Sequence, residues 1–281
     1  MLSVSVGPIV MSVQRGLLWF AVVVTVLVAV FLSRQRKIPV ADTIFSIFIW
    51  AVLGARLAFV ARYSEDYMSP MWSALDIRDG GFDRVAGVLS GLFYAFWRGW
   101  RESQLRRPLA ISLGVGALTW LIVTVGFLIL ENTAREMPET KLSTMSGSDT
   151  SLASRHDGRP MVVNLWASWC PPCRREMPVL EAAQKAYPEV QFIFVNQREP
   201  IWIVQQYLSS ESLRLRNMLL DANGDLAKDL GAYGLPATLY YSADGELIDS
   251  HFGELSQATL RHAIVRLRRA VDHAEVNNSD Q

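Results

Sequence analysis

Both cysteines of the 281-residue chain lie in one short segment, NLWASWCPPCRREMP, as Cys170 and Cys173. An apolar, β-branched run precedes them and a helical pattern follows, so the first sulfur should lie at the start of a helix. Unpaired backbone N–H groups and the positive end of the helix dipole stabilise a thiolate at such a position. We expect Cys170 to be an exposed nucleophile and Cys173, one turn later and more buried, to be the thiol that resolves a mixed disulfide.

Other uses of a single Cys-x-x-Cys pair fit the chain less well. A structural zinc site needs four ligands, and none of the four histidines is close to the cysteines in sequence. A covalent haem site needs a histidine after the second cysteine, where the chain has Arg174, and an iron–sulfur cluster needs more thiols. A structural brace across two residues would constrain the unfolded chain very little. The pattern therefore indicates a redox-active disulfide between Cys170 and Cys173, with no metal and no other cofactor.

From residue 160 onward the chain alternates between apolar strands and amphipathic helices. Strands are expected at 160–167, 190–196, 217–222, 235–242 and 246–252, and helices at 170–187, 201–213 and 255–271. The last two strands are joined by Ala-Asp-Gly, which is typical of a hairpin. This order predicts an α/β domain with a mixed central sheet.

The segment LWASWCPPCRREMPVLE resembles the active-site segment of the TlpA/ResA branch of thioredoxin-like proteins. Members of this branch are membrane-tethered thiol-disulfide oxidoreductases on the outer face of bacterial membranes. The resemblance covers about residues 156–275 and implies supporting roles for Trp169 and Pro172. It also implies that Glu176, three residues after the second cysteine, tunes the thiols and transfers protons. The alternative is that Glu176 is a carboxylate of the first helical turns with no catalytic part.

Two further positions follow from the same resemblance. The segment GLPATLYYSADG resembles the family loop in which a cis-proline faces the disulfide, which implies a cis bond between Leu235 and Pro236. Thioredoxins themselves carry a buried aspartate six residues before the first cysteine, where this chain has Asn164. That departure agrees with the TlpA/ResA branch and leaves the acid–base role to Glu176. The two residues after Cys173, Arg174 and Arg175, either add a positive field to the site or lie in solvent.

Residues 16–130 are dominated by long apolar runs, unlike the rest of the chain. About four membrane-spanning helices are expected, at 16–32, 38–60, 85–97 and 108–130, the third of which is short for a span. Buried helices of a soluble protein are the alternative, but they would be expected to show polar stripes, which the first and last runs lack. The lipid bilayer is therefore an expected partner.

The connections between the apolar runs differ in charge. Two of them are strongly basic, and they carry Arg34, Arg36 and Lys37 in one case and Arg98, Arg101, Arg106 and Arg107 in the other. The remaining connection, 61–84, mixes acidic and basic residues. The positive-inside rule therefore places the two basic connections in the cytoplasm and both termini outside.

A second resemblance lies in this apolar half. The segments GARLAFVARY and DGGFDRVAGVLSG resemble the corresponding part of prolipoprotein diacylglyceryl transferases, over about residues 40–130. Arg56, Asp79 and the two following glycines fall on the family pattern. The histidine of that family is replaced by Val85, and no histidine precedes His156. The resemblance therefore implies a catalytically silent relative of that fold.

Arg56 is an ionisable residue inside an expected span, which makes it a functional candidate. It would either bind an anionic lipid headgroup or pair with Asp79 or Asp83 near the outer surface. We favour the pairing, because charges within spans usually find a partner.

The chain is thus expected to have three parts. A transmembrane domain covers 1–130, a Ser/Thr-rich flexible linker covers 131–155, and a thioredoxin-like domain covers 156–281. The 27 basic residues balance the 27 acidic ones, so nucleic acid is not an expected partner.

The expected function is that of a disulfide reductase on the periplasmic side of a bacterial inner membrane, acting on protein disulfides or dithiols. Relatives in the TlpA/ResA branch are mostly reductases. The alternatives are a dithiol oxidase or isomerase, a lipid-binding or transferase-like membrane protein with an accessory redox domain, and a binding module that does not need Cys170. Residues 1–169 contain no cysteine, so a separate electron donor or acceptor in the membrane is expected.

Overall fold

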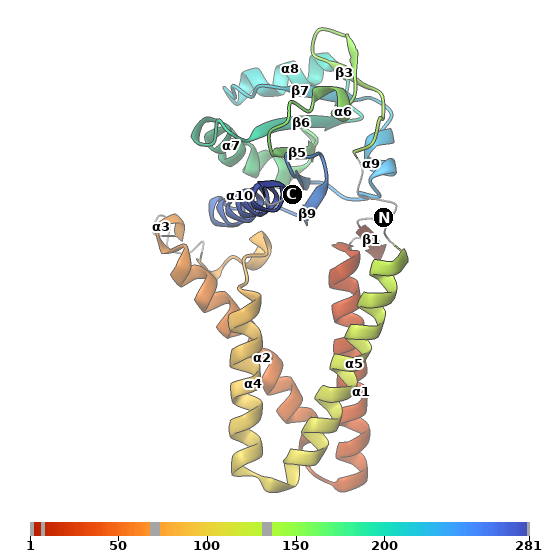
Figure 1. The fold of residues 1–281 in the computed structure, drawn as a ribbon, viewed down its shortest axis with the longest axis vertical. Helices are drawn as coiled ribbons and strands as arrows, with labels where there is room; N and C mark the ends of the chain where they lie inside the picture. Colours follow the sequence, from red (N-terminus) through yellow and green to blue (C-terminus); the bar gives the residue numbers. More distant parts are fainter. Residues whose placement is uncertain (1–2, 7–8, 68–73, 131–136, 280–281) are drawn as a thin grey trace. The chain divides into compact units, whose positions relative to one another are not determined.

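The computed structural model describes residues 3–6, 9–67, 74–130 and 137–279. The chain divides into two units, which Figure 1 shows as a group of long helices and a sheet flanked by shorter helices. The helical unit is Gln14–Asn132, and the sheet unit is Thr133–Gln281 together with Met1–Val13. In the latter segment, β1 (Ser3–Val6) and β2 (Ile9–Ser12) form an antiparallel hairpin.

The helical unit contains four long helices, as expected. They are α1 (Val13–Arg36), α2 (Val40–Arg62), α4 (Arg84–Arg101) and α5 (Arg106–Leu130), with the short elements α3 (Ser64–Tyr67), η2 (Ile77–Asp79) and η3 (Ser103–Leu105) between them. Among the described residues, the segments long and apolar enough to cross a membrane are Val13–Gln35, Val40–Arg62 and Ser103–Phe127. Helix α4 has 18 residues and is therefore about 27 Å long, close to the thickness of a bilayer core.

Small residues allow α2 and α4 to pack closely. A Cβ atom added to Gly87 would lie 3.0 Å from the Ala55 side chain, and one added to Gly91 would lie 3.2 Å from the Ala51 side chain. Lipid tails are as apolar as the helix surfaces, so the hydrophobic effect does not drive helices together in a membrane. Close backbone contact of this kind is therefore a main source of helix association there. A larger residue at either glycine would push the two helices apart.

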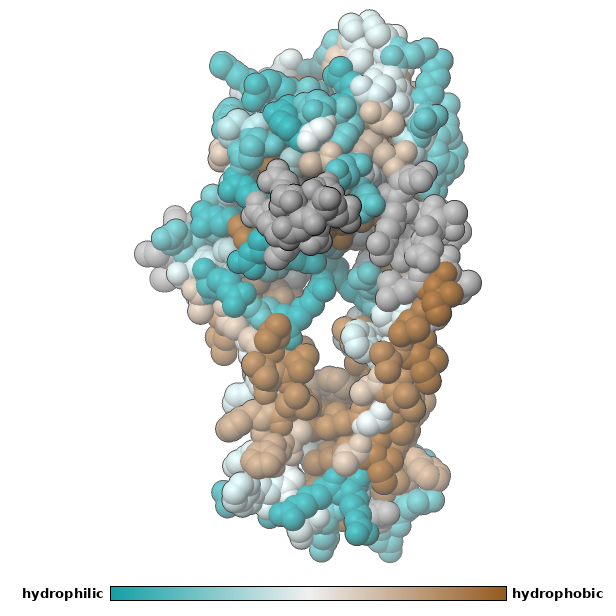
Figure 2. Space-filling model, viewed as in Figure 1, coloured by the Kyte–Doolittle hydropathy of each residue, from teal (hydrophilic) through white to brown (hydrophobic). Residues whose placement is uncertain are grey.

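The outward surfaces of these helices are apolar. The exposed large side chains include Trp19, Leu27, Phe45, Leu57, Phe93 and Ile129. Figure 2 shows this brown surface along the helices, with teal side chains at the end where α4 leads into α5. An apolar band that is exposed on several helices is the surface expected of a bilayer-embedded unit.

The sheet unit is built on a seven-stranded mixed sheet of order β4-β3-β7-β6-β5-β8-β9. Its strands are β3 (Leu142–Thr144), β4 (Asp149–Thr150), β5 (Met161–Trp166), β6 (Gln191–Gln197), β7 (Met218–Asp221), β8 (Ala237–Tyr241) and β9 (Leu247–Phe252). Strands β5, β6 and β7 are parallel, and β8 and β9 follow as the antiparallel hairpin that the sequence predicts. The fold is a thioredoxin-like domain with a mixed central sheet.

In the described part of this unit, helices cover both faces of the sheet. One face packs against α7 (Pro171–Ala186), α8 (Ile201–Ser210) and α10 (Gln257–Ser279), through buried residues such as Met177, Val204 and Ile264. The other face packs against α6 (Leu152–Arg155) and α9 (Asp225–Asp229), through Leu152 and Leu226. Alternate residues of each strand enter the two cores, because successive side chains of a strand point to opposite faces.

The folded part begins earlier than the expected boundary. Residues 142–155, assigned to a flexible linker, form β3, β4 and α6, and β3 extends the sheet by pairing with β7. Leu142 and Leu152 are buried and hold this polar segment on the core. Two apolar residues ten positions apart show no strand or helix period, so the pattern did not reveal them. The first part of the expected linker, 131–136, lies outside the described residues.

Candidate active site

The two cysteines lie where β5 ends and α7 begins. Cys170 is the N-cap residue of α7 and forms a disulfide with Cys173, and its Sγ accepts a hydrogen bond from the Cys173 backbone N–H at 3.3 Å. Pro171 and Pro172 occupy the first two helical positions, where their fixed φ suits a helix start. Neither proline has an N–H. Of the first three helical positions, only the third can therefore donate to the sulfur.

The disulfide is more buried than expected. Cys170 is 3% exposed rather than an exposed residue, and Cys173 is 0% exposed. The bond to Cys173 and the N-cap hydrogen bond turn the Cys170 sulfur toward the helix and the core. The preceding side chain, Trp169, is 66% exposed, so the solvent-facing surface beside the disulfide is aromatic.

Glu176 lies one turn after Cys173 on the buried face of α7 and is 0% exposed. Its Oε1 accepts a hydrogen bond from Asn164 Nδ2 at 2.8 Å, and its Oε2 accepts one from the Leu255 backbone N–H at 2.9 Å. Burial nevertheless raises the pKa of Glu176 to about 8. Desolvation destabilises the charged carboxylate by more than these two hydrogen bonds stabilise it. The carboxyl is mostly protonated at neutral pH and titrates close to it, so it can accept or donate a proton beside the cysteines.

Asn164 connects this carboxyl to the sheet. It lies on β5 opposite Thr238 of β8, and its Nδ2 also donates to Thr238 Oγ1 at 2.9 Å. The sequence identified Asn164 only as a departure from the thioredoxin aspartate, and it did not identify Thr238 or Leu255. Asn164 and Thr238 are neutral, so Glu176 is the ionisable group of these three hydrogen-bonded side chains.

The loop before β8 reaches the same edge of the sheet as Cys170. The bond between Leu235 and Pro236 is cis, as the resemblance implied. Leu165, near the end of β5, pairs with Ala237 at the start of β8. Pro236, the residue before Ala237, therefore lies close to the end of β5. The Pro236 carbonyl accepts a hydrogen bond from the Gly253 N–H at 3.0 Å, which anchors the loop to the start of the segment that leads into α10.

The two arginines after the disulfide are exposed to solvent, and each is paired with a carboxylate. Arg174 Nη2 lies 2.6 Å from Glu211 Oε1, and Arg175 binds Glu254 through two of its nitrogens at 2.5–3.0 Å. Each positive charge is therefore offset by a carboxylate. Of the two alternatives for these arginines, the structure therefore favours side chains in solvent over an added positive field at the disulfide.

A buried glutamate that the sequence did not suggest holds the loop before Cys170. Glu199 is 7% exposed, and its carboxylate accepts hydrogen bonds from the Ser168 N–H at 2.7 Å and from Ser168 Oγ at 2.5 Å. Asn196 Nδ2 donates to the same carboxylate at 2.7 Å. The carboxylate thus joins the loops that follow β5 and β6. The Asn-x-x-Glu spacing after a buried strand is the one signal that could have indicated it.

The membrane-region residues Arg56 and Asp79 are also brought together. Arg56 Nη1 lies 2.9 Å from Asp79 Oδ1 and 2.8 Å from the Gly81 carbonyl oxygen, and Tyr67 Oη donates to Asp79 Oδ2 at 2.5 Å. Arg56 also donates to the carbonyls of Ala74 and Asp76. So many partners within the chain favour a structural role over binding of a lipid headgroup.

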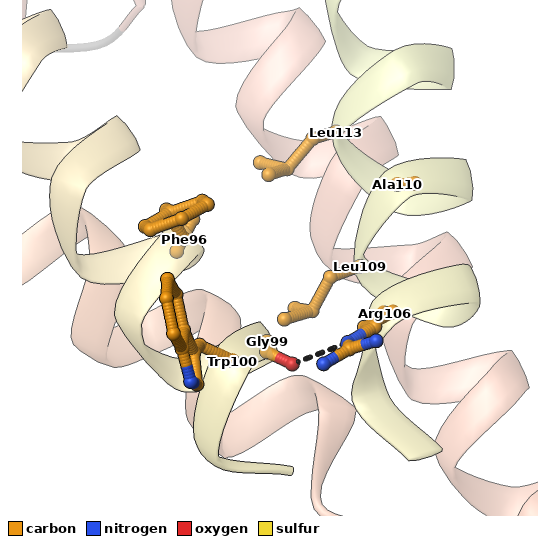
Figure 3. Close-up of a pocket in the computed structure, with 8 residues that line it drawn as sticks. Phe96, Gly99, Trp100, Arg106, Leu109, Ala110 and Leu113 are labelled. Atoms are coloured by element: carbon orange, nitrogen blue, oxygen red, sulfur yellow. Dashed lines mark hydrogen bonds between the residues drawn. The ribbon is translucent and has the colours of Figure 1, made fainter. Parts of the chain in front are cut away.

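A small pocket lies between α4 and α5 of the helical unit. Figure 3 shows Phe96 and Trp100 of α4 facing Leu109 and Leu113 of α5, with Arg106 donating to the Gly99 carbonyl at 2.8 Å. Its volume is about 300 Å³. Apart from Arg106 the lining is apolar, so the pocket offers no group for thiol chemistry. Among the described residues, no cluster of three or more His, Cys, Asp or Glu could hold a metal ion.

Two protein families match successive parts of the chain. Residues 132–264 match the Redoxin family, and residues 5–128 match the prolipoprotein diacylglyceryl transferase family. The thiol:disulfide interchange protein DsbE of Yersinia pestis is 30% identical over 47% of this chain and 71% of that protein. The soluble secreted antigen MPT53 of Mycobacterium tuberculosis is 32% identical over 46% of this chain and 77% of that protein. DsbE of Pseudomonas fluorescens biotype C is 28% identical over 60% of this chain and 95% of that protein.

The Redoxin match contains the disulfide, the buried Glu176 and the cis-proline loop. The other match covers most of the helical unit, including the Arg56 cluster. This chain belongs to the thioredoxin-like thiol-disulfide oxidoreductases of the DsbE/ResA type, and it carries a region of the prolipoprotein diacylglyceryl transferase type on its N-terminal side.

Proposed function

We propose that this protein is a membrane-anchored disulfide reductase that works through Cys170 and Cys173. In the reduced protein, the Cys170 thiolate attacks one sulfur of a substrate disulfide. The substrate S–S bond breaks, one substrate thiol leaves, and a new bond joins Cys170 to the other substrate sulfur. Cys173 then attacks Cys170, which releases the second substrate thiol and forms the Cys170–Cys173 disulfide. Two electrons pass from the protein to its substrate.

Glu176 is the proposed proton acceptor in the second step. Cys173 must lose its proton before it attacks, and it is buried, so water cannot easily remove that proton. Glu176 lies three residues after Cys173 on the same helix. Side chains three residues apart are neighbours on the surface of a helix. With a pKa of about 8, a minority of Glu176 is ionised at neutral pH, and this form can accept the proton. A pKa close to the working pH is also where proton transfer by a side chain is most efficient.

The direction of electron flow is proposed from the weak stabilisation of the Cys170 thiolate. Strong disulfide oxidants owe their potential to a stabilised reduced form. In this protein Pro171 and Pro172 remove two backbone donors from the sulfur, and the cations of Arg174 and Arg175 are paired with carboxylates. The Cys170 thiolate thus keeps the Cys173 N–H and the helix start but lacks these further donors and unpaired cations, which supports a reductase over an oxidase.

The proposed location of the sheet unit is the outer face of a bacterial inner membrane. The two basic connections, α1 to α2 and α4 to α5, lie at the same end of the helical unit in Figure 1, and the positive-inside rule assigns that end to the cytoplasm. The chain then leaves α5 on the outer side. We therefore propose a transmembrane domain up to residue 130 and a thioredoxin-like domain that includes 142–155.

Reducing equivalents must reach this domain from another molecule. Residues 1–169 contain no cysteine, so the helices cannot carry electrons by thiol exchange. A separate dithiol protein in the membrane is the proposed electron donor, and extracytoplasmic protein disulfides are the proposed substrates.

The disulfide at the start of α7, with a titratable buried carboxyl one turn beyond it, is the observation that carries this proposal. Its test is the reduction potential of the full-length protein in lipid nanodiscs, equilibrated with dithiothreitol buffers. A value near about −270 mV, that of thioredoxin, supports a reductase, whereas one near about −120 mV would make the protein an oxidant.

A further inference from the structure

The short segment between β9 and α10, residues 253–255, contacts α7 at two successive residues. Arg175 Nε and Nη2 lie 2.5–3.0 Å from the carboxylate oxygens of Glu254. The next residue of each element makes the second contact, in which the Leu255 backbone N–H donates to Glu176 Oε2 at 2.9 Å. Two adjacent residues of α7 thus hold two adjacent residues of the 253–255 segment.

These two contacts differ in their exposure to solvent. The side chains of Arg175 and Glu254 are 47% and 22% exposed, whereas Glu176 is 0% exposed. An arginine that binds a carboxylate through two of its nitrogens fixes the orientation of that carboxylate as well as its distance. The ion pair therefore restrains, from the surface, the peptide group whose N–H reaches the buried carboxyl.

Further hydrogen bonds hold the 253–255 segment to the strand side of the domain. The Gly253 N–H donates to the Pro236 carbonyl at 3.0 Å, and Gly253 has a φ of 107°, a conformation that favours glycine. His251 Nε2 lies 3.3 Å from the Glu254 carbonyl oxygen, which can only accept a hydrogen bond. The Arg175–Glu254 pair is the charged part of the attachment to α7, and a surface substitution can remove it.

The 253–255 segment brings two opposing influences to Glu176. Burial has the largest effect and raises the pKa of Glu176, and the negative charge of Glu254 raises it further. The hydrogen bonds from the Leu255 N–H and from Asn164 lower this pKa. Arg175 therefore acts in one direction through two contacts, because it holds the Leu255 donor in place and offsets the Glu254 charge.

Other titratable groups surround the same carboxyl. Cys173 lies one turn earlier on α7, Tyr240 lies on β8, and His251 of β9 contacts the peptide group between Glu254 and Leu255. Burial raises the pKa of Tyr240, and nearby carboxylates raise it further, so this phenol stays neutral. Among these groups, Cys173 is the one whose proton Glu176 would accept.

We propose that Arg175 and Glu254 are positioning residues for disulfide exchange, because their ion pair holds the Leu255 N–H on the Glu176 carboxyl. The inference rests on the proposed function and deepens it, since it names the contact that sets the pH range in which Glu176 accepts a proton. The exchange itself is unchanged. The Cys170–Cys173 dithiol is oxidised, the substrate disulfide is reduced, and the Cys173 proton moves to Glu176.

The test separates the two steps of exchange in the full-length protein in lipid nanodiscs. The protein is reduced with dithiothreitol, which is then removed, and a peptide disulfide is added. At low peptide concentration the second-order rate constant reports the attack by Cys170. At saturating peptide the first-order release of the second thiol reports the attack by Cys173, in which Glu176 takes part.

Arg175→Gln should change the second step and leave the first step unaltered. The substitution loosens the Leu255 donor and leaves the Glu254 charge unpaired, and both changes raise the pKa of Glu176. We expect the midpoint of the pH profile for the first-order step to rise by about half a pH unit. At neutral pH the ionised fraction of Glu176, and with it the first-order rate, should then fall about threefold.

Arg174→Gln is the matched control. Arg174 precedes Arg175 on α7 and is similarly exposed, but it pairs with Glu211 at the end of α8. Its profile should equal that of the unmodified protein. Arg175→Lys keeps a cation beside Glu254 and should shift the midpoint less than Arg175→Gln does. In a Glu176→Gln background, Arg175→Gln should change neither rate, because the pair acts through Glu176.

Each outcome bears on a different claim. Equal midpoints in Arg175→Gln and the unmodified protein, or the same shift in Arg174→Gln, would overturn the positioning role and leave the proposed reductase intact. An effect of Arg175→Gln that persists in Glu176→Gln, or a full shift in Arg175→Lys, would overturn it as well.

Stability is checked in the same variants by their melting temperatures. An exposed ion pair contributes little to global stability, so all variants should melt close to the unmodified protein. A large fall in Arg175→Gln would make the pair structural and overturn its assignment as a positioning contact. Failure of the unmodified protein to reduce the peptide at any pH would overturn the proposed function and this inference together.

Discussion

A Pro172→Ala substitution would return one backbone N–H to the first turn of α7. Residue 172 holds the second helical position, and an N-cap side chain accepts hydrogen bonds from the second or third N–H of a helix. The restored N–H should join that of Cys173 in donating to Cys170 Sγ. Alanine has the highest helix propensity, so α7 itself should be unaffected.

The size of the effect follows from the two redox states of Cys170. A hydrogen bond to a charged group contributes about 1.5–3 kcal/mol, and the neutral disulfide sulfur gains less from the same donor. Taking the lower end, the reduced form should be favoured by about 1.5 kcal/mol. For a two-electron couple about 30 mV corresponds to about 1.4 kcal/mol, so the reduction potential should rise by about 30 mV.

Pro178→Ala is the matched control, because it adds an N–H to the same helix about 9 Å further along the axis. Full-length variants are equilibrated with glutathione or dithiothreitol buffers of graded potential, and the reduced fraction is read from the mass added by a maleimide. We expect a less negative potential for Pro172→Ala and an unchanged one for Pro178→Ala. An unchanged potential for Pro172→Ala, or the same shift in both variants, would refute the account of how α7 sets the potential.

Three further substitutions test other parts of the structure. Glu176→Gln should slow disulfide exchange by about a hundredfold and remove the step near pH 8 from its pH profile, and an unaltered profile would exclude Glu176 from proton transfer. The folded pKa of Glu176, about 8, lies above the ordinary value of 4.5, so between these pH values the folded state binds more protons at this residue than the unfolded state does. That stabilisation is lost as the pH rises from about 4.5 to about 8, so the melting temperature should fall more steeply over this range in the unmodified protein than in Glu176→Gln. Glu199→Ala leaves buried donors unpaired and should cost about 1–3 kcal/mol of unfolding free energy, measured by chemical denaturation, whereas Glu246→Ala in an exposed turn should cost little; equal costs would argue against the buried contact. Arg56→Ala leaves a buried carboxylate unpaired, at about 3–5 kcal/mol, and should lower the yield of folded protein in size-exclusion chromatography, while Arg78→Ala, in an exposed pair, should not. Normal yield of Arg56→Ala with lost thiol exchange would contradict a structural role.

Much of the sheet and the redox pair could be predicted because their signals are local. Buried parallel strands such as β5 and β6 are continuous apolar runs, and a Cys-x-x-Cys pair carries its chemistry in four adjacent residues. The Ala-Asp-Gly turn likewise marks the β8–β9 hairpin within a few positions. The four long helices were visible for the same reason, because the bilayer demands long stretches without charge.

The contacts that complete the site could not be predicted, because they join residues far apart in the chain. The hydrogen bond from the Leu255 N–H to Glu176 spans 79 positions, and the bonds from Ser168 to Glu199 span 31. A single sequence contains no signal for such pairs. The burial of Cys170 was missed for a related reason: the position of a helix start follows from the pattern, but the direction in which its N-cap side chain points depends on the packing around it.

The most direct test of the account asks which sulfur forms the mixed disulfide. Full-length Cys173→Ala and Cys170→Ala variants are mixed with a disulfide peptide, and the covalent adducts are measured by mass spectrometry. We expect a stable adduct on Cys170 in the Cys173→Ala variant and almost none in the Cys170→Ala variant, because the remaining thiol is fully buried. Adducts formed equally by both variants, or only through Cys173, would contradict the assignment of Cys170 as the nucleophile.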